Sequence, residues 1–129
     1  MLMIIDKVPM SKNKYVNQHW AKRRQYKDGI LLKMEEQMEL EIGLNPSAYK
    51  GLPYKQCKVV FTIFFDSKRR RDVHNYVGGG LVSWLDCMVD LKIIEDDCWD
   101  VIGQPLVFFD YDKEFPRTEI LVEEVKRNK

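Results

Sequence analysis

The sequence predicts a small α+β domain in which two helices pack on a mixed sheet of about four strands. Two observations carry this prediction. Four segments have the apolar pattern of strands, and two longer segments repeat apolar residues every three or four positions, as helices do. These elements follow the order β-α-β-α-β-β, and the 129-residue length suits one domain over residues 1–129.

The first half of the chain predicts a strand, a polar loop and a long helix. Residues 2–8 have a strand pattern that ends at Pro9, and residues 11–18 are polar enough to form a loop. Residues 19–42 carry an apolar stripe that repeats about every four residues, which indicates a helix with one buried face. Glycines and prolines within residues 43–53 then predict a connecting loop. The helical stripe consists of Trp20, Ile30, Leu31, Met34, Met38 and Ile42.

The second half predicts a central strand, a second helix and two closing strands. Residues 56–66 are apolar on one face and partly apolar on the other, which is typical of a central strand. Residues 76–91 have a helical pattern, although each glycine at residues 78–80 costs about 1 kcal/mol relative to alanine. Residues 104–110 and 118–125 indicate two further strands. The buried face of the second helix would contain Leu81, Trp84, Leu85 and Met88.

Cationic side chains form two local clusters, although the formal net charge is only +1. A balanced charge excludes a strongly basic field over the whole protein, so a nucleic-acid contact must come from such clusters. The first cluster contains Lys12, Lys14, Lys22, Arg23, Arg24 and Lys27, and the second contains Lys68, Arg69, Arg70 and Arg71. We expect contacts to DNA phosphates from Lys12, Lys14, Arg23, Arg24 and the whole second cluster.

The start of the first helix is basic, whereas four glutamates occupy its later turns. This order opposes the helix dipole, which favours acidic residues near the N-terminus. Two interpretations remain open, namely that phosphate binds at this helix start or that the cations form a solvated face. Tyr15, His19 and Trp20 alternate with the cations and can stack on bases or sugars. We nevertheless expect Trp20 to belong to the core.

Cysteine usage and hydropathy indicate a cytoplasmic protein without membrane contact. The three cysteines include no C-x-x-C pair, which favours a reduced compartment. The apolar N-terminus is interrupted at Asp6 and lacks the basic beginning of a signal peptide. No apolar run approaches the length that crosses a bilayer.

Asp72, His74 and Asn75 lie at the predicted junction between the central strand and the second helix. In an extended backbone, Asp72 and His74 would point to the same face and could hold a divalent metal. Asn75 would lie close to them at the helix start. The alternative interpretation is that Asp72 caps the helix and His74 is a solvated loop residue.

Asp96 and Asp97 form a second acidic pair after the predicted helix. That helix would be about 24 Å long, and residues 93–97 could return by about 17 Å as an extended segment. Such a return would bring Asp97 near Asp72, and Asp86 on the helix could face the same cleft. Adjacent acids are also a common turn signal, and Asp86 fits equally well as a solvated helical residue.

Residues 69–75, 84–86 and 93–97 together resemble the RusA family of Holliday-junction resolvases. The pattern of that family is a basic run, D-x-D-N, a helix with an aspartate, and a D-D pair. Residues 9–15 also resemble the P-x-S-x-N-x-x-Y stretch that opens many members. The likeness covers most of the chain, although the loop at residues 43–53 and the last two strands match only in hydrophobic pattern.

The resemblance implies a dimeric, Mg²⁺-dependent endonuclease that nicks four-way DNA junctions symmetrically. It makes Asp72 and Asp97 catalytic metal ligands, and His74 stands where the family usually has its second aspartate. With His74 in the catalytic set, Asp96 and Asp97 complete the expected metal ligands, and Asn75 and Asp86 support them. Histidine can ligate Mn²⁺ more readily than Mg²⁺, so Mn²⁺ can substitute.

Two further departures from the family pattern concern the segment after Asn75. Gly78 falls where well-known members have a functional lysine, and the segment between Asn75 and Asp86 is about four residues longer. Lys14 or an arginine of the second cluster can replace that lysine. The sequence therefore favours a junction-resolving endodeoxyribonuclease. The alternative is a non-catalytic DNA-binding protein that descends from such an enzyme, and a protein-interaction module explains the charge clusters poorly.

Overall fold

A mixed four-stranded sheet forms the centre of the computed structural model, which describes residues 1–126. Its strands are β1 (Leu2–Ile5), β2 (Cys57–Phe65), β3 (Leu106–Tyr111) and β4 (Arg117–Glu124), arranged in the order β1-β4-β2-β3. β2 runs parallel to β3, whereas β4 runs antiparallel to both β1 and β2. The predicted α+β class and mixed sheet are confirmed, and β2 is an inner strand as expected.

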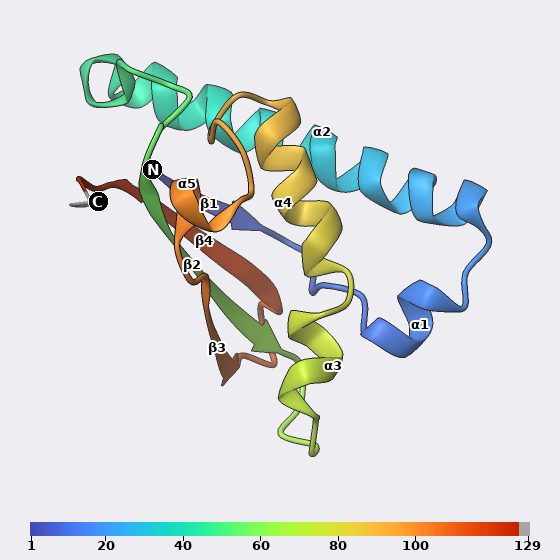
Figure 1. Cartoon of the computed structure of the whole chain (residues 1–129). Coiled ribbons are helices and arrows are strands. Elements are labelled where there is room, and N and C mark those ends of the chain that lie inside the picture. Colours follow the sequence, from blue (N-terminus) through green and yellow to red (C-terminus); the bar gives the residue numbers. More distant parts are fainter. Residues whose placement is uncertain (127–129) are drawn as a thin grey trace.

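Two larger helices cover one face of this sheet. α2 (Trp20–Leu44) and α4 (Leu81–Asp90) lie on the same side, and α1 (Lys12–Val16) lies beside α3 (Val73–Val77) at one end (Figure 1). The remaining helical segments are η1 (Pro46–Tyr49) and α5 (Trp99–Ile102). Among residues 1–126, no helix has both the length and the apolar character needed to span a bilayer.

The core lies between the sheet and the covering helices. β2 alternates as predicted, so that residues 57, 59, 61, 63 and 65 are buried. From α2, Ile30 and Met34 complete the buried layer, and from α4 the indole of Trp84 is fully buried. The expectation for Trp20 is wrong, because 66% of its surface is exposed at the first turn of α2.

The predicted second helix is interrupted at residues 78–80, giving α3 and α4 in place of one helix. The physical reason is a close passage of the N-terminal segment across these glycines. A Cβ atom at Gly79 would lie 2.5 Å from the backbone nitrogen of Lys12, and one at Gly80 would lie 2.7 Å from that of Met10. The Gly80 N–H also donates a 2.8 Å hydrogen bond to the Met10 carbonyl. Only residues without a side chain allow this approach.

Residues 9–12 thus cross the glycines at residues 79–80, and the hydroxyl of Tyr26 on α2 also holds this crossing. Its oxygen accepts hydrogen bonds from the Met10 N–H (3.0 Å) and from the indole N–H of Trp84 (2.6 Å). One oxygen atom therefore connects the N-terminal segment, α2 and α4. The predicted loop at residues 11–18 contains α1, because the Ser11 hydroxyl accepts the Lys14 N–H and caps a short helix.

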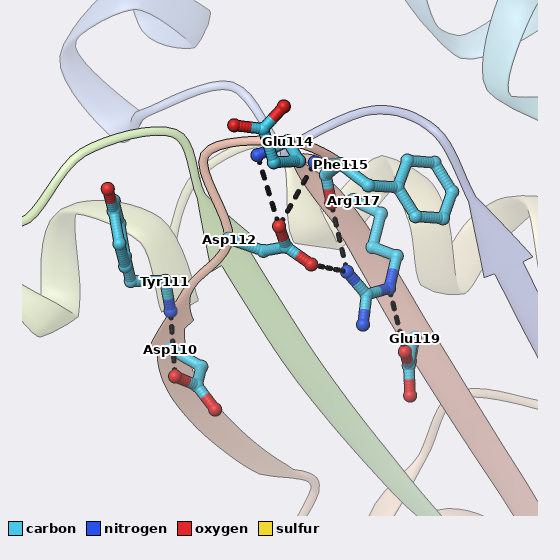
Figure 2. A network of polar contacts seen from close by, with 7 residues as sticks. All are labelled: Asp110, Tyr111, Asp112, Glu114, Phe115, Arg117 and Glu119. Atoms are coloured by element: carbon cyan, nitrogen blue, oxygen red, sulfur yellow. Dashed lines mark hydrogen bonds and ion pairs between the residues drawn. The ribbon is translucent and has the colours of Figure 1, made fainter.

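The turn between β3 and β4 is organised by Arg117 (Figure 2). Its guanidinium donates hydrogen bonds to Asp112 (2.8 Å), to the Phe115 carbonyl (2.9 Å) and to Glu119 (2.8 Å). It also lies over the Phe64 ring, 3.9 Å from the ring centroid. The hydrogen bond from Arg117 is the largest influence that lowers the pKa of Asp112. Arg117 therefore stabilises this turn.

Gly79→Ala should destabilise the protein by about 2 kcal/mol, because its Cβ would meet backbone atoms that cannot move aside cheaply. Gly29→Ala on α2 is the matched control, since a Cβ there meets nothing within 4 Å. The control should stabilise the protein by about 1 kcal/mol through helix propensity. Urea unfolding of both variants measures the difference, and equal effects would contradict the proposed crossing.

Candidate functional site

The N-terminal segment and the basic loop after β2 form a common pocket of about 430 Å³. Its cationic lining residues are Lys14 from α1 together with Arg69 and Arg71 from the loop. Asp66 contributes one carboxylate, and Tyr26, Phe65 and Tyr76 contribute aromatic surface. Residues 9–14 and residues 69–71, far apart in sequence, thus meet at one surface hollow.

Arg71 is an internal part of the basic loop, because only 8% of its side chain is exposed. Its guanidinium donates to the Ser67 carbonyl (2.9 Å), the Ser67 hydroxyl (3.1 Å) and the Arg69 carbonyl (3.1 Å). The same group lies 4.0 Å from the centroid of the Phe65 ring. Arg71 therefore shapes the loop, and its Nε has no hydrogen-bond partner among the described residues.

Most of the other residues predicted to contact phosphate have exposed side chains. Lys12, Lys14, Lys68, Arg69 and Arg70 are exposed, and none of them forms an ion pair with a carboxylate within residues 1–126. Lys68 lies over the Tyr111 ring at 5.2 Å from its centroid. Among the predicted phosphate contacts, these five side chains and Arg24 are exposed and have no carboxylate partner within residues 1–126.

At the start of α2, the cations have different local roles. Arg23 is half-buried, donates to the Gln18 carbonyl (3.1 Å) and lies 5.7 Å from the Tyr15 ring centroid. Arg24 is exposed, and Lys27 pairs with Asp90 at 3.0 Å. The Nδ1 atom of His19 accepts the Ala21 N–H (3.2 Å), and its ring lies 5.4 Å from the Trp20 ring. His19 thus caps α2, while Trp20 presents an exposed aromatic face beside Arg24.

The predicted ligands Asp72 and His74 lie at the beginning of α3, and both are exposed. Asp72 occupies the N-cap position, but its carboxylate makes no capping hydrogen bond. His74 is inside the helix, so the extended-backbone argument that placed both side chains on one face does not apply. The Asn75 side-chain oxygen accepts the Asn13 N–H at 3.2 Å. Asn75 therefore joins α3 to α1.

The predicted return of residues 93–97 forms no strand of the sheet, and Ile94 makes a single bridge with Tyr54. Asp96 and Asp97 are exposed, and the Asp96 carboxylate accepts the Asp97 N–H (2.8 Å). This hydrogen bond matches the turn interpretation of Asp96. The negative charge of Asp97 is one of the influences that raise the pKa of Asp86 on α4.

The pKa of Asp86 depends on its burial and on the charged residues around it. Partial burial raises the pKa of Asp86 above its ordinary value, and the Lys27 ammonium opposes that effect. The negative charges of Asp97 and Asp90 raise the pKa further. The charge of one carboxylate of the predicted set, Asp97, therefore affects the pKa of another, Asp86.

Within residues 1–126, no three acidic, histidine or cysteine side chains form a group that could hold one metal ion. Asp72, His74, Asp96 and Asp97 are accordingly not assembled as a set in this structure. The Asp86–Asp97 pair does fit Mg²⁺ by its donor chemistry. That ion is often held by one or two carboxylates, water and the phosphates of a substrate.

Comparison with known proteins adds no relative to this description. No protein-family model matches the chain, and no curated protein matches it either.

Tyr26 and the glycines at residues 79–80 are the site residues that sequence reasoning missed. The three consecutive glycines within a helical pattern were a usable signal, because glycine there often marks a close backbone approach. Tyr26 had no comparable signal. Its role comes from the Met10 and Trp84 donors, which lie 16 positions before and 58 positions after it.

Asp97→Asn should lower the pKa of Asp86, because it removes a negative charge that disfavours ionisation of Asp86. Asp96→Asn is the matched control, since Asp96 is not among the groups that act on Asp86. Carbon-detected NMR titration of the Asp86 carboxyl measures both variants. An Asp86 pKa that is equally unchanged in both variants would show that Asp86 and Asp97 do not interact.

Proposed function

We propose that this protein is a Mg²⁺-dependent, structure-selective endodeoxyribonuclease that cuts four-way DNA junctions. The observation that carries the proposal is the meeting of residues 9–15 with the loop at residues 68–71 and with Asn75. The Asn13–Asn75 hydrogen bond and the shared pocket join these segments, and the Gly80–Met10 hydrogen bond holds residues 9–15 against the start of α4. Residues 9–15 and 69–75 are two of the four stretches on which the resemblance to RusA resolvases rests.

Phosphate binding is assigned to the exposed cations of α1 and of the loop at residues 68–71. Lys12 and Lys14 on α1 lie on one side, and Lys68, Arg69 and Arg70 lie on the other. Because they have no carboxylate partners in the described chain, they can neutralise DNA phosphates without first breaking an ion pair. Such contacts position a duplex without reading its sequence. Trp20 and Arg24 extend this surface along α2.

Metal binding is assigned to Asp86 and Asp97, with Asp72, His74 and Asp96 as the further ligands that the resemblance implies. Bound Mg²⁺ would supply charge neutralisation at the scissile phosphate and a more acidic water. The negative charge of Asp97 raises the pKa of Asp86, and a bound cation would offset that effect. The neutral imidazole of His74 makes Mn²⁺ an acceptable substitute.

Symmetric cutting of a four-way junction needs two active sites, and a two-fold homodimer would provide them. Dimerisation is therefore part of the proposal. The second candidate function is a DNA-binding protein without nuclease activity. It is favoured by His74, which stands where the family usually has its second aspartate.

Asp72→Asn should reduce junction cleavage by at least about a hundredfold, because it removes a ligand charge while preserving the side-chain shape. Junction affinity measured without metal should stay within about twofold of the parent. Asp28→Asn, an exposed aspartate on α2, is the control and should cleave normally. Wild-type cleavage by Asp72→Asn would remove Asp72 from the catalytic set.

Replacing both Arg69 and Arg70 with alanine should flatten the salt dependence of junction binding. Two lost phosphate contacts should lower the slope of log affinity against log salt by about 1.8. Lys58→Ala is the charge control, because Lys58 is an exposed residue of β2 and no part of the basic loop. Fluorescence anisotropy at several salt concentrations gives the slopes. An unchanged slope in the double variant would place the loop outside the DNA interface.

A further inference from the structure

The pocket between α1 and the basic loop presents hydrogen-bond donors that the fold does not use. The Tyr26 oxygen already accepts from Met10 and Trp84, and its own hydroxyl proton has no acceptor among the described residues. Burial is the largest influence that raises the pKa of Tyr26, so this proton is retained at neutral pH. Tyr26 lines the pocket and can therefore donate to a ligand within it.

Arg71 adds a second donor whose position is fixed. The guanidinium is held by Ser67 and by the Phe65 ring, while its buried Nε has no partner within residues 1–126. The single carboxylate of the pocket, Asp66, lies 3.7 Å from Arg71, a long ion pair. Lys14 and Arg69 bring two further positive charges to the same lining. A lining of three cations and one acid favours an anion with several acceptor oxygens, such as a phosphate group.

The rest of the lining is apolar and aromatic. Pro9, Met10 and Pro116 contribute flat or flexible apolar surface, and Phe65 and Tyr76 contribute rings. The Tyr76 ring is fixed edge-on between Phe65 (centroids 5.1 Å apart) and Phe109 (5.8 Å). Such surface is unnecessary for phosphate alone. It is what the sugar and the base of a nucleotide require.

We propose that this pocket binds one unpaired nucleotide, with its phosphate on Lys14, Arg69, Arg71 and Tyr26. Its base and sugar lie against Pro9, Met10 and Tyr76. The volume of about 430 Å³ lies within the range of small-molecule sites and suits one nucleotide. A base within a paired duplex cannot enter without unstacking, which is least costly at unpaired or mismatched positions.

The choice of DNA as the source of this nucleotide rests on the proposed function. In a junction-cutting enzyme, the pocket would select branched DNA by holding a base freed near the branch point. A free nucleoside monophosphate carries the same chemistry and serves as the probe. The pocket can therefore be tested without any cleavage assay.

The test is calorimetric titration of the full chain with deoxyadenosine monophosphate, deoxyadenosine and inorganic phosphate. The monophosphate should bind at least about tenfold more tightly than either fragment, because each fragment lacks one half of the contacts. Lys14→Ala should weaken monophosphate binding about tenfold. Lys58→Ala, which removes the same charge from β2, should leave it unchanged. Tyr26→Phe, checked for folding by circular dichroism, should weaken it as well.

Equal affinity for inorganic phosphate and the monophosphate would overturn the nucleotide assignment, as would the absence of binding. Equal weakening by Lys14→Ala and Lys58→Ala would also overturn it, because the effect would then be one of general charge. In a DNA arm, a duplex with a one-nucleotide bulge should bind more tightly than the matched duplex, and Lys14→Ala should remove that difference. Failure of junction cleavage with nucleotide binding intact would refute the nuclease and leave the pocket standing.

Discussion

The passage of residues 9–12 across the glycines at residues 79–80 is the contact on which the arrangement of the proposed site depends. It needs glycines between α3 and α4, because a side chain there would collide with the N-terminal segment. It also needs the Tyr26 hydroxyl, which accepts a hydrogen bond from the Met10 N–H. Because Trp84 donates to the same oxygen, the crossing is also tied to the core. Together with the Asn13–Asn75 hydrogen bond, it holds α1 beside α3 and brings Lys14 to the pocket that Arg69 and Arg71 also line.

Ion pairing within the fold distinguishes the cations of this nearly neutral chain from one another. Arg117 donates its hydrogen bonds to acceptors around its own turn, and Lys27 and Lys33 pair with aspartates. The exposed lysines and arginines around α1 and the loop after β2 have no such acid partners in the described chain. Among the described residues, the cations thus fall into a group paired within the fold and a group without acid partners.

Periodicity was sufficient for the strands and the long helix, because alternation in β2 and the four-residue repeat of Ile30 and Met34 directly report a buried face. It was insufficient for Trp20, since Trp20 lies at the first turn of α2, far from the other residues of the stripe that fix the buried face. The break between α3 and α4 depends on a backbone segment nearly seventy positions earlier. The three glycines signal a close backbone approach, but local pattern does not identify the segment that approaches.

For the acidic residues, the structure does not show the grouping that the sequence predicts, because no three potential ligands gather within residues 1–126. The return of residues 93–97 was expected to bring Asp97 to Asp72, because the helix was taken as one unbroken rod. With a ten-residue α4, Asp97 instead acts on Asp86. Asp72 and His74 remain on α3, where the short helix presents them to solvent.

The most direct test of the central claim is cleavage of a labelled four-way junction by the purified full chain, beside a linear duplex of the same sequence. With Mg²⁺ or Mn²⁺, the account predicts paired nicks at symmetric positions of the junction and an intact duplex. No nicks with either metal, or equal cutting of both substrates, would contradict it.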